Sequence, residues 1–157
     1  MIRYILMAAG IFFGDLVIKN HVEREFPETG EQRRFNGIIR LRKHYNKGAF
    51  LNAGEHRRSL VALLSVLLTL VVTVLFVLSL GTRGNAWLRT GLALLLGGAF
   101  SNTYDRLKRK YVVDYLSFGV KWKWFANIIF NISDFGIIIG ALMAALSAEK
   151  VSLRNVP

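Results

Sequence analysis

Two stretches decide the fold: GGAFSNTYDRLKRKYVVDY at residues 97–115 and FANIIFNISDFG at residues 125–136. The first predicts the end of an apolar helix followed by a strand that carries Asp114. The second predicts an apolar helix with Asp134 inside it. A carboxylate within an apolar run is costly, so such residues are candidates for a functional site. We predict that Asp114 and Asp134 face one another as a catalytic pair.

Outward from these stretches, long apolar runs dominate the chain. It has 157 residues, of which 53% are hydrophobic, and its mean hydropathy is +0.37. A membrane-spanning helix needs about 20 apolar residues. We therefore predict an all-α membrane protein that forms a single membrane-embedded domain over residues 1–157. Its four transmembrane helices are expected at about residues 2–18, 60–80, 86–104 and 125–148, with a surface loop at residues 20–58.

Charge and composition exclude several partners. The formal net charge is +11, but most Lys and Arg lie between the apolar runs, where each interacts with anionic lipid head groups at about 1 kcal/mol. No RNA-binding motif accompanies them, so we predict membrane lipid, and no nucleic acid, as a partner. The chain has no Cys, and His21, His44 and His56 lack metal-binding spacing. We predict surface histidines, no metal and no cofactor.

The first apolar run, residues 2–18, contains Asp15 and is followed by Lys19. A cleaved signal peptide is an alternative interpretation, but no A-x-A cleavage pattern follows the run. Asp15 and Lys19 are one helical turn apart, so they share a helix face and can pair. A simpler alternative is a Lys that extends to the membrane interface beside an Asp partner.

The surface loop carries a strand signal and one glycine of interest. Asn36-Gly37 is a turn signal, and the residues after it alternate between apolar and basic at the period of a half-buried strand. The loop closes on Asn46 and Gly48, where the glycine allows a backbone to approach a ligand closely. We predict a small β-like element on the membrane surface.

Four spans bring the unusual polar residues to one membrane face, because the ends of spans one and three and the starts of spans two and four all lie there. These residues are Asp15, Lys19, Asn46, Gly48, Asn102, Asp105, Arg106, Asn131 and Asp134. In the third span, Gly91, Gly97 and Gly98 allow close helix contact. Asp105 and Arg106 can alternatively form a plain ion pair at a helix end.

The depth of Asp134 favours an acid–base role. It lies about nine residues past Phe125, which places it about 13 Å along the predicted fourth helix, with Asn131 on the same face. Two carboxylates that share a site hold one proton between them, because the charge of one raises the pKa of the other. The protonated partner acts as a general acid and the ionised one activates water. Such a pair hydrolyses an amide without a metal, Ser or Cys.

Two alternatives for these residues stay open. Asp134 can be a structural hydrogen-bond acceptor to a neighbouring helix. A Ser–Lys dyad of Lys19 with Ser101 or Ser133 would also hydrolyse an amide. We rank the dyad low, because it leaves both aspartates unexplained.

Five motifs follow one another over nearly the whole chain. Residues 15–19 resemble D-x-x-x-K, and residues 46–50 contain a match to N-x-G-A. GGAFSNTYDR at 97–106 resembles GGA-x-G-N-x-x-D-R, VVDY at 112–115 resembles V-x-D-F, and FNISD at 130–134 resembles F-N-x-A-D. In this order the motifs resemble those of the lipoprotein signal peptidases (signal peptidase II).

The resemblance implies a membrane aspartyl endopeptidase with Asp114 and Asp134 as its catalytic dyad. Its substrate would be a diacylglyceryl prolipoprotein, cut on the amino side of the lipidated Cys. The other motif residues would hold substrate or order the site: Asp15, Lys19, Asn46, Gly48, Asn102, Asp105, Arg106 and Asn131. Three departures bear on substrate preference more than on chemistry: Ser101 for Gly, Ser133 for Ala and Tyr115 for Phe.

The resemblance also implies a multi-pass protein of the bacterial inner (plasma) membrane, with its site near the extracytoplasmic face. Charge opposes this orientation: sixteen of the 21 Lys and Arg lie on the motif face and five on the other, and the positive-inside rule places the basic face in the cytoplasm. We follow the resemblance, because a folded loop can hold its charge against lipid head groups. The alternative functions are a small proton-coupled transporter or channel and a non-catalytic membrane protein that binds lipidated peptides.

Overall fold

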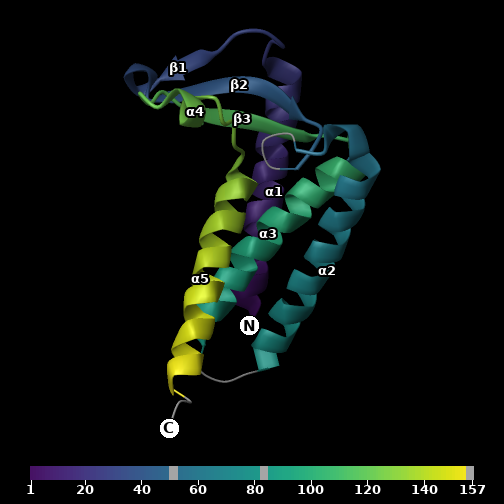
Figure 1. The fold of residues 1–157 in the computed structure, drawn as a ribbon, viewed down its shortest axis with the longest axis vertical. Helices are drawn as coiled ribbons and strands as arrows, with labels where there is room; N and C mark the ends of the chain where they lie inside the picture. Colours follow the sequence, from purple (N-terminus) through teal and green to yellow (C-terminus); the bar gives the residue numbers. More distant parts are fainter. Residues whose placement is uncertain (50–52, 82–84, 155–157) are drawn as a thin grey trace.

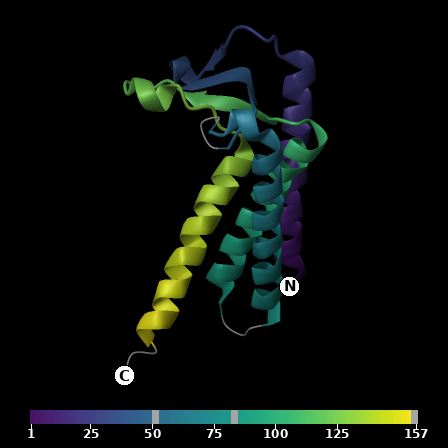
Figure 2. The same ribbon diagram turned by 45° about the vertical axis from the view of Figure 1, so that its right-hand side comes forward.

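A computed structural model describes residues 1–49, 53–81 and 85–154. Phe50, at the end of the second motif, and most of the connection predicted at residues 81–85 lie outside the described residues. Four long helices lie side by side beneath a small sheet (Figures 1 and 2). They are α1 Ile2–Glu25, α2 Arg58–Gly81, α3 Ala86–Lys108 and α5 Ile132–Arg154. The chain is thus mainly helical with a small β element, as predicted.

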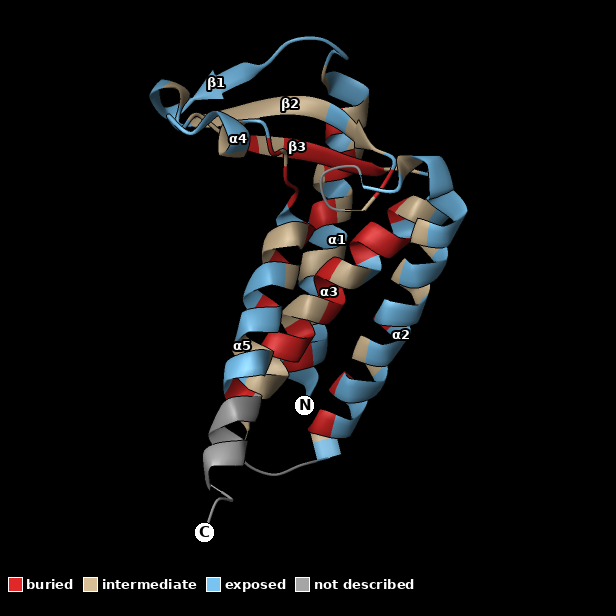
Figure 3. Ribbon diagram, in the orientation of Figure 1, coloured by how far each residue is buried: buried red, intermediate tan, exposed pale blue. Residues whose placement is uncertain are grey.

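Helix α3 is the centre of the bundle, since it packs against α1, α2 and α5. Its glycines make this possible: a Cβ at Gly98 would meet the Ser133 carbonyl oxygen at 2.4 Å, and one at Gly97 would meet the Ala8 carbonyl oxygen at 2.5 Å. The close helix contact predicted from these glycines is confirmed. Figure 3 shows buried residues along α3, whereas α2 presents mostly exposed leucines and valines.

The sheet has three antiparallel strands in the order β1-β2-β3. Strands β1 (Gln32–Arg34) and β2 (Ile39–Asn46) come from the surface loop, and β3 (Val112–Phe118) follows α3. The turn between β1 and β2 is a 3₁₀ segment, η1 (Phe35–Gly37), in which Asn36 and Gly37 have φ of 54° and 85°. These left-handed conformations suit Asn and Gly. The strand and turn predicted in the loop are confirmed.

The start of the predicted fourth helix is wrong. A short helix, α4 (Lys123–Ala126), ends early, and α5 begins only at Ile132. Between them Phe130 exchanges backbone hydrogen bonds with Leu116 of β3, at 2.7 and 2.8 Å. The sheet edge thus satisfies backbone groups that a continuous helix would have used. Asp134 therefore lies in the first turn of α5 and not about 13 Å along a helix.

The membrane-spanning character of the helices is uneven. By length and composition, one helical stretch among the described residues, Glu55–Gly81, is sufficient to cross a membrane; it comprises η3 (Glu55–Arg57) and α2. Its most apolar window has a mean hydropathy of 3.0. Residues Ile132–Ser147 form a shorter apolar helix. Helix α1 extends to Glu25 and α3 to Lys108, beyond the predicted ends near residues 18 and 104.

Candidate active site

Asp134 is held by the start of its own helix. Its backbone N–H donates to Asn131 Oδ1 (2.9 Å), and its Oδ2 accepts from the Asn131 N–H (2.9 Å). This reciprocal arrangement is a capping box, which satisfies two otherwise unpaired N–H groups of the helix start. The other carboxylate oxygen of Asp134, Oδ1, accepts a hydrogen bond from Asn102 Nδ2 of α3 (2.9 Å). The structural-acceptor alternative for Asp134 therefore describes some of its contacts, but it does not account for the second carboxylate nearby.

That second carboxylate is Asp114, on β3, which is only 3% exposed. Its Oδ1 accepts from Asn131 Nδ2 (2.7 Å) and its Oδ2 from Asn46 Nδ2 of β2 (3.1 Å). The Gly48 N–H donates to Asn46 Oδ1 (3.1 Å) and so fixes the orientation of that amide. Asn131 contacts both aspartates.

The two carboxylates also interact electrostatically. Burial and, second to it, the charge of Asp134 raise the pKa of Asp114 to about 7, against the lowering effect of the Asn46 and Asn131 hydrogen bonds. A carboxyl group that titrates near neutral pH is suited to general acid–base chemistry.

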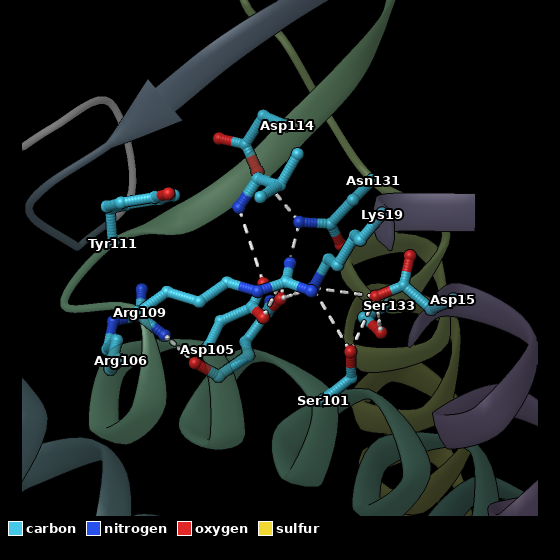
Figure 4. Close-up of polar contacts among 12 residues, drawn as sticks. Asp15, Lys19, Ser101, Asp105, Arg106, Arg109, Tyr111, Asp114, Asn131 and Ser133 are labelled. Carbon is cyan, nitrogen blue, oxygen red and sulfur yellow. Dashed lines mark hydrogen bonds and ion pairs between the residues drawn. The ribbon is translucent and has the colours of Figure 1, made fainter. Parts of the chain in front are cut away.

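A buried cationic residue, Lys19, lies below Asp114 in the view of Figure 4. Lys19 Nζ lies 2.7 Å from Asp15 Oδ2 and 3.0 Å from Asp105 Oδ2, and all three side chains are fully buried. The predicted Asp15–Lys19 pair is therefore present. The alternative of a Lys that reaches the membrane interface is wrong. Lys19 also donates to Asn102 Oδ1 (2.9 Å), which turns the Asn102 amide nitrogen towards Asp134.

Asp105 and Arg106 do not form the plain ion pair considered from the sequence. Asp105 instead pairs with Lys19 and with Arg109 (3.1 Å), and its Oδ2 accepts from the Val113 N–H (3.3 Å). Arg106 donates to the carbonyl oxygens of Asn102 and Gly48, both at 3.2 Å. Arg106 thus ties the chain after β2 to α3.

A Ser–Lys dyad is also present geometrically, since Lys19 Nζ lies 3.1 Å from Ser101 Oγ. However, Lys19 Nζ is already ion-paired with Asp15 and Asp105. Ser101 is 1% exposed, and its hydroxyl donates to Asp15 Oδ2. These contacts argue against a nucleophilic role.

A cavity of about 720 Å³ opens beside the two aspartates. Its polar lining includes Asn46, Asn102, Arg106, Asp114 and Asp134. Its apolar lining comes from three helices and the segment before α5: Leu68, Val72, Leu95, Ala99, Ile128, Ile129, Ile137 and Ile138. The cavity therefore joins a polar end at the carboxylates to an apolar end between helices.

Sequence reasoning missed two contributors to this site, His44 and Arg109. His44 is exposed, as predicted, yet it lines the cavity and pairs across the sheet with Asp114. Arg109 pairs with Asp105 and Glu23 and donates to Asn20. A run of basic residues after α3 concealed its role.

Among the described residues, no three His, Asp or Glu side chains cluster so as to hold a metal ion.

The comparison with protein families is decisive. A family model described as "Signal peptidase (SPase) II" matches residues 7–149. The chain belongs to the signal peptidase II family. Membership confirms the family predicted from the five motifs, and with it an enzyme of the aspartic peptidase class located in a membrane. The roles of individual residues stay predictions.

Relatives named "Lipoprotein signal peptidase" agree with this assignment. The protein of Lactobacillus johnsonii is 29% identical over 97% of this chain and 95% of its own length, and that of Histophilus somni is 33% identical over 94% and 88%. The protein of Pseudomonas syringae pv. tomato is 39% identical over 68% of this chain, an alignment that covers 62% of that protein.

Two solved structures share the fold. Both are described as bacterial membrane enzyme structures obtained by the in meso method, at 2.3 and 1.9 Å resolution. Their TM-scores are 0.82 and 0.77, at 19% and 20% identity, and they cover 99% and 94% of this chain and 93% of their own chains. At this identity the likeness is one of fold.

Proposed function

We propose that this chain is an intramembrane aspartyl endopeptidase that removes the signal peptide from diacylglyceryl-modified prolipoproteins, cutting on the amino side of the lipidated Cys. One observation carries the proposal: Asp114 and Asp134 line the same cavity, and Asn side chains from β2, α3 and the start of α5 hold both carboxylates. Membership of the signal peptidase II family supports the substrate class.

In the resting site, Asp114 carries the proton that the pair shares. The raised pKa of Asp114, about 7, supports this assignment. Asp134 is the ionised partner, because it lies in the first turn of α5, where the helix dipole favours negative charge. The Asn102 and Asn131 donors reinforce that preference.

Hydrolysis then proceeds in two steps. Asp134 takes a proton from water as the water oxygen attacks the scissile carbonyl carbon, and Asp114 gives its proton to the carbonyl oxygen. When the tetrahedral intermediate collapses, the C–N bond breaks and the leaving amine takes the proton from Asp134. A hydroxyl proton of the intermediate returns to Asp114, which restores the resting site.

The apolar end of the cavity supports a lipidated substrate. Leu68 of α2, Leu95 of α3 and Ile138 of α5 line this apolar end, where they could contact the acyl chains of the substrate. The helices α1, α2, α3 and α5 have 23 or 24 residues. At about 1.5 Å per residue they match a hydrocarbon core of about 30 Å, so we propose that all four cross the membrane. The site would face the extracytoplasmic side.

The transporter alternative receives less support. It requires a relay of four aspartates, but Asp15 and Asp105 are fully buried in ion pairs with Lys19. Carboxylates fixed in this way are poor carriers of a mobile proton. A passive lipopeptide-binding protein would not need two aspartates that share a cavity.

The test is cleavage of a purified diacylglyceryl prolipoprotein in detergent, with release of the signal peptide as the signal. Asp114→Asn and Asp134→Asn keep shape and hydrogen-bonding capacity, so folding and substrate binding should survive. Each should lower kcat by about 10²–10⁴-fold. Because residues that act as a unit are not additive, the double variant should be scarcely worse than either single one.

The control is Glu25→Gln, a carboxyl-to-amide change at an exposed residue near the end of α1, which should cleave at the wild-type rate. Substantial cleavage by either Asn variant would rule out the dyad. Absence of cleavage by the wild-type protein, with bound substrate or proton flux instead, would favour one of the alternative functions.

A further inference from the structure

Asp15 accepts hydrogen bonds from a set of buried hydroxyls that the proposed mechanism does not use. Ser101 Oγ and Ser133 Oγ each lie 2.6 Å from its Oδ2, and Tyr115 OH lies 2.9 Å from its Oδ1. All three donors are less than 5% exposed, and they come from α3, α5 and β3. Figure 4 shows Asp15 with Ser101, Ser133 and Lys19 around it. Four elements of the fold therefore meet at one carboxylate.

Each hydroxyl residue is the direct neighbour in sequence of a site residue: Ser101 of Asn102, Tyr115 of Asp114, and Ser133 of Asp134. Adjacent Cα atoms are 3.8 Å apart, so a side chain fixed at one position limits where the next can lie. On β3, successive side chains point to opposite faces. Tyr115 can therefore bind Asp15 of α1 while Asp114 contacts Asn46 and Asn131.

Tyr115 also reaches the start of α5. Its hydroxyl oxygen accepts a hydrogen bond from the Ile132 N–H (3.1 Å), one of the N–H groups that a helix start leaves unpaired. A single hydroxyl thus joins Asp15 to the turn that carries Asp134, while its own strand carries Asp114. These contacts connect the two proposed catalytic carboxylates independently of Asn131.

We propose that Asp15 and the hydroxyls of Ser101, Tyr115 and Ser133 form a positioning cluster that sets the spacing of Asp114 and Asp134. None of the four is among the described residues that line the cavity. The cluster therefore acts on the two carboxylates through the backbone and not on the substrate. The inference rests on the proposed peptidase function, and it differs from the role in substrate preference expected for these three positions.

The spacing of the pair should be readable in the titration of Asp114. The charged and titratable groups that act on it or face it are Lys19 of α1, Arg106 of α3, Asp134 of α5 and His44 of β2. Asp105 of α3 contacts the N–H of the preceding residue, Val113. Of all these groups, Asp134 contributes most to the raised pKa of Asp114, after burial itself. A looser pair, with more water between the carboxylates, should lower that pKa towards its ordinary value.

The test is the triple variant Ser101→Ala, Tyr115→Phe and Ser133→Ala, which removes three hydroxyls without adding volume. A misplacement of about 1 Å can cost about 10²-fold in rate, so we expect kcat per folded molecule to fall at least about 10-fold, with KM within about twofold. The control is Ser147→Ala, which removes a buried hydroxyl of α5 that bonds only to the Met143 carbonyl oxygen among the contacts described. It should keep the wild-type kcat.

A second readout needs no turnover: the carboxyl ¹³C titration of Asp114 in aspartate-labelled protein. In the triple variant its apparent pKa should fall by about half a unit or more. If the wild-type protein does not cleave prolipoprotein, the proposed function fails, while this titration still decides on the cluster. Tyr115→Phe alone provides both readouts if the triple variant does not fold.

Three results would overturn the inference. They are an unchanged kcat, a change in KM alone, and a loss of thermal stability with kcat per folded molecule and the Asp114 titration unchanged. The last result would mean that the hydroxyls only stabilise the fold.

Discussion

Replacing Lys19 by Met tests whether the buried ion pairs beneath the site stabilise the fold. Met has a similar length and no charge, so the change removes the ammonium without leaving a large void. Lys19 lies between Asp15 and Asp105, and all three side chains are fully buried. In the variant, Asp105 keeps Arg109 at 3.1 Å. Asp15 keeps only the neutral donors Ser101, Tyr115 and Ser133, so one buried carboxylate loses its counter-charge.

Breaking a buried pair by removing one partner costs about 3–5 kcal/mol. The hydroxyl donors to Asp15 remain, so we expect the lower end, about 3 kcal/mol. For a chain of this size, 1 kcal/mol changes the Tm by about 2–4 °C, which gives a fall of about 6–12 °C. Thermal unfolding in detergent at a fixed scan rate measures it, with Lys108→Met, at an exposed residue near the end of α3, as the control.

Adding Asp15→Asn to Lys19→Met removes the uncompensated charge together with its partner. The double variant should therefore recover at least half of the lost stability, and the two changes should be clearly non-additive. A fall of less than about 2 °C for Lys19→Met, or a double variant less stable than the single one, would refute the assignment of Lys19 as the central counter-charge.

Three further predictions follow from contacts described above. The pKa of Asp114 is raised in the folded state from 3.8 to about 7, so between these pH values the folded protein binds more protons than the unfolded chain, and its stability should fall as pH rises from about 4 to about 7. At 1.36 kcal/mol per pKa unit this fall is at most roughly 4 kcal/mol. Asp114→Asn should remove it, as measured by denaturation curves at a series of pH values. Gly98→Ala places a Cβ 2.4 Å from the Ser133 carbonyl oxygen and should destabilise by about 1–3 kcal/mol, whereas Gly10→Ala, with nothing within 4 Å, should be neutral in thermal unfolding. A reporter inserted near Thr29 should be labelled from the extracytoplasmic side, and cytoplasmic labelling would reverse the proposed orientation.

The sequence predicted the site best where residues are fixed by local spacing or by chain topology. Asp15 and Lys19 pair because one helical turn separates them. Asn46 and Asn102 reach the two aspartates as expected from four helices that share one face. The β-like element in the loop followed from the alternation after Asn36-Gly37, and it became β2.

The break before α5 could not be read from hydrophobicity, because residues 125–130 are almost as apolar as the helix that follows. Phe130 leaves the helix since β3 offers it backbone partners, and those partners are distant in sequence. One local signal was available: Asn131 and Asp134 have the spacing of a capping box, which marks a helix start. Weighing that signal would have placed Asp134 in the first turn.

The role proposed for the hydroxyl residues could not be predicted from the sequence. Ser101, Tyr115 and Ser133 have no common pattern, and they converge on Asp15 only after α3, β3 and α5 are packed. The role of Arg109 could not be predicted either, because it lies within a run of basic residues. Only the structure shows that Arg109 pairs with Asp105.

The pairing of β2 with β3 has a consequence for biogenesis. Asn46 and Asp114 are 68 positions apart, and their hydrogen bond forms only when these two strands, which lie on either side of α2 and α3 in sequence, come together. Closing such a long loop is costly in chain entropy, so it is expected late in folding. A nascent chain that has inserted only α1 and α2 lacks both Asp114 and Asp134, since these residues lie on β3 and α5. The candidate site would thus be complete only once α5 has inserted and β2 has paired with β3.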